Sequence, residues 1–173
     1  MVQIKAKGQR WFKFVHAFFV CMWVGACVCL NLLLFFMRPE NGMQLYGINA
    51  TMKFIDDFII VPGAVGCLLT GILYSVFTHW GWFKHRWITM KWLITVYGIL
   101  FGTFYLGPRL DSLAPISKAE GLKALANPIY IDNMTMLKYW GTFQLLTIIC
   151  AVFISIFKPW KRERETARAP KGV

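Results

Sequence analysis

Residues 14–37 of the chain read FVHAFFVCMWVGACVCLNLLLFFM, a stretch with no Asp, Glu, Lys or Arg. A helix needs about 20 mainly apolar residues to cross the hydrocarbon core of a bilayer, and this stretch provides them. Three further apolar stretches follow at residues 58–77, 87–106 and 139–157. Because lipid offers no hydrogen-bond partners, each backbone polar group must be satisfied within its own element. We therefore predict an all-α integral membrane protein, an antiparallel bundle of four transmembrane helices.

The composition of the whole chain agrees with this fold class. Of its 173 residues 57% are apolar and 16% are charged, whereas about a quarter of a soluble domain is charged. The formal net charge of +11 would suggest nucleic-acid binding in a soluble protein. In a chain of apolar spans the same excess is a topology signal, so we expect the lipid bilayer as partner and no nucleic acid. We expect one transmembrane domain over residues 1–158 and a basic cytoplasmic tail over residues 159–173.

The segments between the spans are predicted to be loops. Residues 38–52 begin with Arg38-Pro39-Glu40-Asn41-Gly42, a strong turn signal. Residues 78–86 form a short aromatic and basic connection. Residues 107–133 are the longest connection and open with Gly107-Pro108, and we expect a short surface helix over residues 118–125 within them.

The positions of the basic residues predict the orientation of the bundle. Twelve of them fall on the side that holds both termini and the second connection: Lys5, Lys7, Arg10, Lys13, Lys84, Arg86, Lys158, Lys161, Arg162, Arg164, Arg168 and Lys171. The positive-inside rule places this side, and therefore both termini, in the cytoplasm. On the other side Asp56 and Asp57 open the second span and Arg109 follows the third, so we expect an ion pair there between Arg109 and one of these aspartates.

Two ionisable residues, His16 and Lys91, lie within the predicted spans, where such groups are costly and are candidates for function. Each lies about one helical turn, roughly 5 Å, inside the cytoplasmic end of its span. For His16 the alternatives are a haem ligand or a histidine hydrogen-bonded to a neighbouring helix or to water. For Lys91 they are a snorkelling side chain or a functional group, namely a charge partner for an anion or a proton donor.

The haem interpretation is supported by the neighbours of His16. A neutral imidazole is a common ligand of haem iron, and the interior of a helix bundle is a common place for cofactors. Trp23 lies on the same helix face as His16, and Gly25 leaves room for close approach of a flat macrocycle. Lys91 and Arg86 are candidates to hold the propionates, and His79 and His85 are candidates for a second axial ligand.

These residues resemble the motifs of a known group of proteins. His16 followed by Trp23-Val24-Gly25 is similar to the "His, then Trp-x-Gly" signature of small bacterial membrane proteins, which include the HemJ-type protoporphyrinogen oxidases and the copper-resistance D family. The stretch Trp87-Ile88-Thr89-Met90-Lys91 resembles the Trp-x-x-x-Lys that opens the third helix of the HemJ type. Residues 103–109, ending in Gly-Pro-Arg, look more like the uncharacterised relatives of these proteins.

The resemblance covers residues 10–110 and implies a four-helix haem b site in a bacterial inner membrane. It implies that His16 binds the iron and that Lys91 is an essential, catalytic polar partner. The long segment 107–133 departs from the HemJ type. The resemblance therefore implies haem binding more strongly than it implies oxidation of a porphyrinogen.

We therefore expect a haem b protein with a redox role, either oxidation of a small substrate or electron transfer with the quinone pool. A quinone or a porphyrin-like molecule is the expected substrate, and self-association or membership of a larger membrane complex is compatible with so small a bundle. The alternatives are a membrane transporter and a non-catalytic subunit or assembly factor. Few polar residues lie at the span centres, which makes transport the weaker alternative.

Overall fold

The computed structural model describes residues 6–77 and 86–157, and within these residues all regular secondary structure is helical, with only residues 37–41 and 127 outside helices. Helix α1 (Ala6–Phe36) forms the first rod. Helices α2 (Gly42–Ile55), η1 (Asp56–Ile60) and α3 (Val61–Phe77) run on without a break and form the second rod. Helices α4 (Arg86–Phe101), η2 (Gly102–Leu106) and α5 (Gly107–Glu120) form the third. The 3-10 helix η3 (Gly121–Ala126) then leads to α6 (Pro128–Phe157), the fourth rod.

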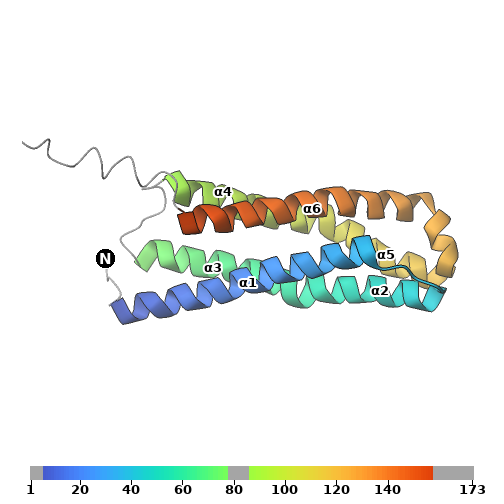
Figure 1. The fold of residues 1–173 in the computed structure, drawn as a ribbon, viewed down its shortest axis with the longest axis horizontal. Helices are drawn as coiled ribbons and strands as arrows, with labels where there is room; N and C mark the ends of the chain where they lie inside the picture. The colour runs from blue at the N-terminus through green and yellow to red at the C-terminus, as the bar shows by residue number, and fades with distance from the viewer. Residues whose placement is uncertain (1–5, 78–85, 158–173) are drawn as a thin grey trace, which may run out of the picture.

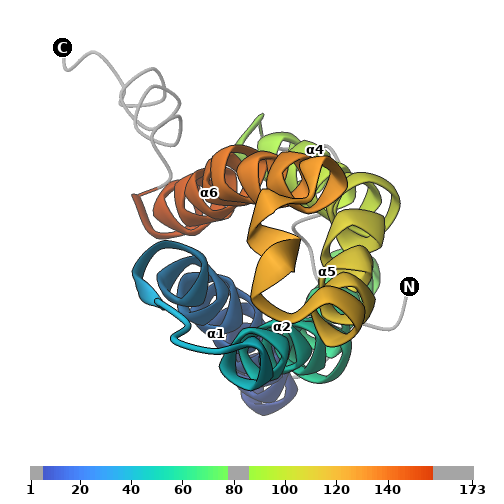
Figure 2. The same ribbon diagram turned by 90° about the vertical axis from the view of Figure 1, so that its right-hand side faces the viewer.

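The four rods lie side by side along the long axis of the molecule (Figure 1). Viewed along this axis they surround a common centre, with α1 beside α6 and α2 beside α5 (Figure 2). The start of α1, the end of α3, the start of α4 and the end of α6 share one end, which we call the terminal end. The 37–41 connection and η3 lie at the other end, which we call the distal end (Figure 1).

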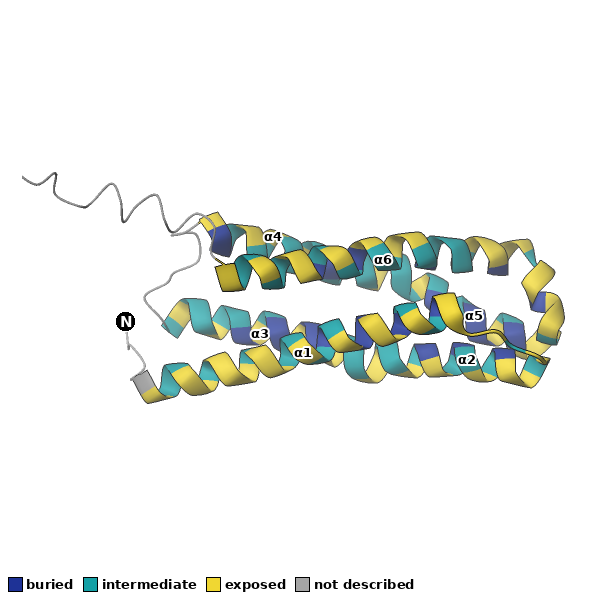
Figure 3. Ribbon diagram, viewed as in Figure 1, coloured by how far each residue is buried: buried dark blue, intermediate teal, exposed yellow. Residues whose placement is uncertain are grey.

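Within the described residues, four helical stretches are long and apolar enough to cross a membrane, as the sequence predicts. Many of their large apolar side chains are exposed, among them Phe14, Phe104 and Phe153. Figure 3 shows exposed residues along the whole length of all four rods. An exposed apolar surface of this extent marks a protein that contacts lipid or other proteins.

The prediction of long loops at residues 38–52 and 107–133 is wrong. The turn at Arg38-Pro39 is present, but α2 begins immediately after it, because the Asn41 side chain caps the helix and accepts the N–H of Gln44 at 2.9 Å. The third rod continues to Glu120, and α6 begins at Pro128 rather than at residue 139. The short surface helix expected over residues 118–125 is divided between the end of α5 and η3.

The second and third rods each contain a π-helical turn that is separated from a following proline by one residue. In η1 the N–H of Val61 reaches the carbonyl of Asp56, five residues back, and Pro62 follows. In η2 the N–H of Gly107 reaches the carbonyl of Gly102, and Pro108 follows. A proline in an α-helix lacks the N–H donor and its ring collides with the carbonyl four residues back. Widening the preceding turn removes that collision, so each helix continues past its proline.

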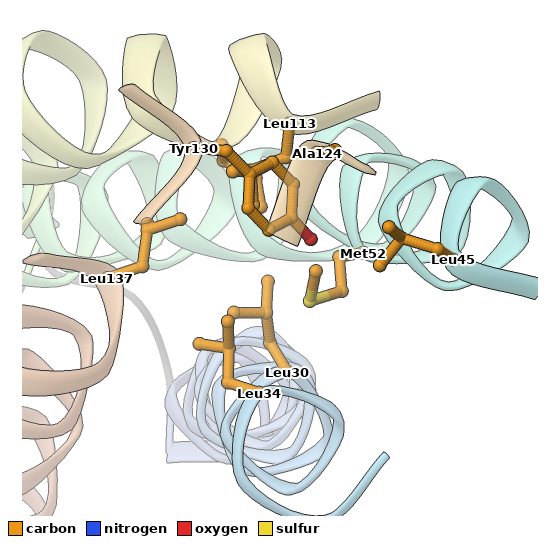
Figure 4. Close-up of a cluster of buried hydrophobic side chains, with 9 residues drawn as sticks. Leu30, Leu34, Leu45, Met52, Leu113, Ala124, Tyr130 and Leu137 are labelled. Atoms are coloured by element: carbon orange, nitrogen blue, oxygen red, sulfur yellow. The ribbon is translucent and has the colours of Figure 1, made fainter. Parts of the chain in front are cut away.

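The buried side chains form two clusters at different heights in the bundle. The distal cluster is drawn in Figure 4 and consists of Leu30, Leu34, Leu45, Met52, Leu110, Leu113, Ala124, Tyr130 and Leu137. Beside it the buried Asn49 amide donates to the Ser117 hydroxyl at 3.0 Å and to the Tyr130 hydroxyl at 3.1 Å. The second cluster, nearer the terminal end, consists of Trp23, Cys27, Ala64, Cys67 and Ile148.

Candidate functional site

A cavity of about 490 Å³ opens between α1, α3, α4 and α6 in the half of the bundle nearer the terminal end. This volume is within the usual range of small-molecule and cofactor sites, roughly 300–1,000 Å³. The cavity extends from Lys13 and Ser155 near the terminal end to Trp23 and Ile148 at its inner end. It lies at the depth of His16 and Lys91, the two ionisable residues that fall within the predicted spans.

Trp23 closes the inner end of the cavity and is held there by two glycines. A Cβ atom on Gly63 of α3 would come within 3.0 Å of the backbone nitrogen of Trp23. A Cβ atom on Gly98 of α4 would come within 3.3 Å of the Trp23 ring. These small residues let α1 approach α3 and let the indole fit against α4, so Trp23 is only 3% exposed. Gly98 thus leaves room on α4 for a side chain of α1.

His16 lies in the wall of the cavity, and its ring is held by α3. The imidazole Nδ1 and the Thr70 hydroxyl oxygen are 2.8 Å apart. The same hydroxyl lies 2.6 Å from the carbonyl oxygen of Gly66 and 3.1 Å from that of Cys67. A threonine hydroxyl has one proton, and a carbonyl can only accept, so the Thr70 proton is committed to its own helix.

With the Thr70 proton on its own helix, the contact is satisfied when Nδ1 of His16 carries a proton and donates a hydrogen bond to the Thr70 hydroxyl oxygen. In this arrangement Nε2 of the neutral ring is unprotonated. A histidine that is fixed through one nitrogen and presents a lone pair on the other is the usual form of a metal-ligating imidazole. In this arrangement the ring has the tautomer that iron ligation requires.

Lys91 lies in the wall of the same cavity and does not extend away into lipid. Its ammonium donates to the Ser155 hydroxyl of α6 at 3.1 Å and lies 5.8 Å from the centre of the Trp87 ring. Lys13 of α1 adds a second ammonium group to the lining. A cavity whose deeper walls are apolar and which has two cations near one end is suited to an amphipathic anion.

The other candidate residues have different locations. Trp23 lines the cavity, as expected. Gly25 is exposed, and no atom lies within 4 Å of the position of an added Cβ, so the expectation that it makes room for a cofactor in this cavity is wrong. Arg86 is exposed at the start of α4 and is not among the lining residues. His79 and His85 lie outside the described residues.

The structure adds residues whose role the sequence does not reveal. Thr70 fixes the His16 ring, Ser155 binds Lys91, and Tyr74 and Trp92 contribute to the walls. The sequence signal for Thr70 is weak, because it is one of several hydroxyl residues in the spans. Only the packing of α1 against α3 selects it. Among the described residues there is no cluster of three or more His, Cys, Asp or Glu side chains that could hold a metal ion by themselves.

Comparison of the chain with protein-family models, with curated proteins and with solved structures gives no match.

Proposed function

We propose that this chain is an antiparallel four-helix protein of a bacterial inner membrane that binds haem b through His16 and has a redox role. The observation that carries the proposal is that His16 and Lys91, from separate rods, line one cavity of cofactor size. The hydrogen bond of His16 Nδ1 with Thr70 also suits the tautomer in which Nε2 is unprotonated and can bind a metal ion.

The lengths of the rods support a bundle that extends beyond the bilayer on one side. The second rod has 36 residues, which corresponds to about 54 Å of helix, whereas the hydrocarbon core is about 30 Å thick. The polar cluster of Asn49, Ser117 and Tyr130 lies in the distal half, where a layer outside the hydrocarbon would place it. In the sequence twelve basic residues fall in the two terminal segments and in the connection between the second and third spans. By the positive-inside rule this places both termini in the cytoplasm and the distal half on the opposite side.

The residues that line the cavity fit a haem. The Nε2 atom of His16 would bind the iron, and the aromatic side chains of Trp23, Trp87 and Trp92 would provide apolar walls. Lys13 and Lys91 supply two cations for the two propionates. Ser155 holds Lys91 through its hydroxyl, which keeps the ammonium at the cavity wall. Haem, when bound, supplies one-electron redox chemistry, and the protein supplies the axial ligand, the charge partners and the exclusion of water.

The absorption spectrum of the purified protein tests this proposal. The chain is produced in haem-sufficient cells and purified in mild detergent, together with His16→Ala, His79→Ala and His85→Ala. We expect a Soret band in the wild type and its loss in His16→Ala. The other two variants are the matched controls, since each removes a histidine other than His16. If one of them also loses the Soret band, the histidine that it lacks is a second ligand of the iron. A colourless wild type that also fails to bind added hemin would refute the proposal.

A further inference from the structure

A second, smaller cavity of about 60 Å³ lies deeper in the bundle, between α1, η1, η2, α5 and α6. Its walls are mainly apolar, and Asn31, Asp56 and Gln144 are the polar side chains that line it. Since one water takes up about 30 Å³ in the liquid, the space suits one or two small species.

Gln144 presents a buried acceptor without a donor at this cavity. Its amide nitrogen donates to the carbonyl oxygen of Gly98 at 3.0 Å, which fixes the amide because that carbonyl can only accept. The residue is 6% exposed, and its Oε1 is fully buried with no hydrogen-bond partner among the described residues. A buried acceptor left in this state costs about 1–3 kcal/mol, so a donor or a cation at this oxygen would stabilise the protein.

The side-chain amide of Asn31, like that of Gln144, directs its nitrogen to a backbone carbonyl oxygen. Its amide nitrogen donates to the carbonyl oxygen of Cys27 at 2.9 Å. Its oxygen lies 2.8 Å from the Thr142 hydroxyl, whose one proton is shared between this oxygen and the Lys138 carbonyl oxygen 2.6 Å away. Both amide nitrogens near the cavity are therefore used on backbone carbonyls. The side-chain groups left to face an occupant are oxygens, including the carboxylate of Asp56.

The surroundings of Asp56 favour a positive charge. The ion pairs among the described residues join Lys53 to Asp57 at 3.1 Å and to Asp111 at 2.6 Å, on the exposed surface. Lys53 thus pairs with two carboxylates, and Asp56 has no ion pair among the described residues. The predicted pair between Arg109 and one of the aspartates is wrong, because Arg109 stacks on the Tyr105 ring, 3.9 Å from its centre. Asp56 is partly exposed, so it connects this surface to the cavity.

Both π-helical turns border the cavity. Asp56 and Ile60 come from η1, and Gly102 and Leu106 come from η2. Such turns inside α-helices are found frequently at functional sites. Interrupted helices also supply the oxygens that coordinate Na⁺ in membrane transport proteins.

We propose that this cavity is a binding site for a small monovalent cation, Na⁺, which enters from the distal half past Asp56. Oxygen ligands suit hard cations, and a single lining carboxylate matches a single positive charge. The Gln144 oxygen is then a ligand rather than an unsatisfied acceptor. This site is separate from the haem cavity, and it does not depend on haem binding.

The test uses the full-length protein in detergent at about pH 8, well above the ordinary aspartate pKa of about 3.9. Thermal unfolding and ²²Na⁺ retention on the monodisperse fraction are measured while Na⁺ replaces N-methylglucamine at constant ionic strength. We expect saturable binding and a saturable rise in Tm in the wild type. We expect the half-saturating Na⁺ concentration to rise by at least about tenfold in Asp56→Asn and in Gln144→Leu.

Two further variants make the test specific. Asp57→Asn removes the neighbouring surface carboxylate and does not alter the lining, so its half-saturation should stay within about threefold of the wild type, given the weak effect of exposed ion pairs. In Gly102→Ala the new methyl group would lie 3.3 Å from the Gln144 amide nitrogen and would occupy the cavity, so binding should be lost without a change in charge. No saturable Na⁺ effect in the wild type, or equal binding in wild type, Asp56→Asn and Gln144→Leu, would overturn the proposal and leave the cavity to water.

Discussion

The hydrogen bond between Thr70 and His16 gives the sharpest prediction about the haem cavity. Replacing Thr70 by Val keeps the shape of the side chain and removes the hydroxyl that lies 2.8 Å from Nδ1. The residue is 7% exposed, so water does not readily replace the lost oxygen. In the variant, iron ligation by Nε2 still requires a proton on Nδ1, but this N–H no longer has its acceptor.

The expected cost follows from the burial of this pair. A buried donor left without a partner costs about 1–3 kcal/mol. Since 1.4 kcal/mol corresponds to a factor of ten in an equilibrium constant, hemin should bind Thr70→Val roughly 10–100-fold more weakly than the wild type. Loss of groups that orient a metal-ligating histidine has effects of this size in metalloproteins, about 10–100-fold.

Titration of the haem-free protein with hemin, followed at the Soret band, measures this affinity. Thr70→Ser retains a hydroxyl and should bind within a few-fold of the wild type. Thr95→Val is the matched control, because Thr95 lines the same cavity and has no hydrogen bond to His16. Equal hemin affinity in the wild type and in Thr70→Val would refute the inference that Thr70 fixes the ring for ligation.

Three other predictions concern helix packing, the distal polar cluster and charge in the haem cavity. Gly63→Ala should lower the free energy of unfolding by about 1–3 kcal/mol, measured as a lower Tm, because the new methyl group would collide with the Trp23 backbone. Gly47→Ala is the control and should leave the Tm unchanged, because the space around Gly47 is open. Asn49→Ala should lower the free energy of unfolding by about 1–3 kcal/mol in the same assay, because Ser117 and Tyr130 lose a shared buried donor. Lys91→Met should weaken hemin binding roughly tenfold, because Lys91 lines the haem cavity. Lys53→Met is the control and should leave hemin affinity unchanged, because Lys53 does not line this cavity.

The sequence predicts the helical class and the four apolar stretches because both depend on local composition. Residues 14–37 contain no Asp, Glu, Lys or Arg over more than a bilayer thickness, and the structure has a single helix there, Ala6–Phe36. That the bundle crosses a membrane stays a prediction, supported by the exposed apolar side chains along the rods.

The extent of the rods could not be predicted in the same way, because proline and glycine are ambiguous signals. Gly107-Pro108 indicates the end of a helix when only local rules are applied. In the structure the widened turn η2 accommodates Pro108, and the helix continues to Glu120. Whether a chain turns or widens one helical turn at a proline depends on the packing of the segment that follows, and here α5 packs on α2 and α6.

The pairing of His16 with Lys91 was predictable because both residues lie at the same depth in their spans, and the structure places both in one cavity. Their partners were not predictable, since Thr70 and Ser155 are selected by the rotation of α3 and α6 about their axes. The prediction for Gly25 fails for a related reason. Spacing along a helix places Gly25 near Trp23, but the side of α1 on which it lies is exposed.

Chemical rescue of His16→Gly tests iron ligation by this residue most directly. The variant removes the imidazole and leaves a space in the cavity wall that free imidazole can enter. We predict that hemin added to His16→Gly gives the wild-type Soret position only when imidazole is present, and that imidazole has no such effect on Thr95→Gly. A wild-type spectrum in His16→Gly without imidazole would show that the iron has another ligand and would contradict the proposed site.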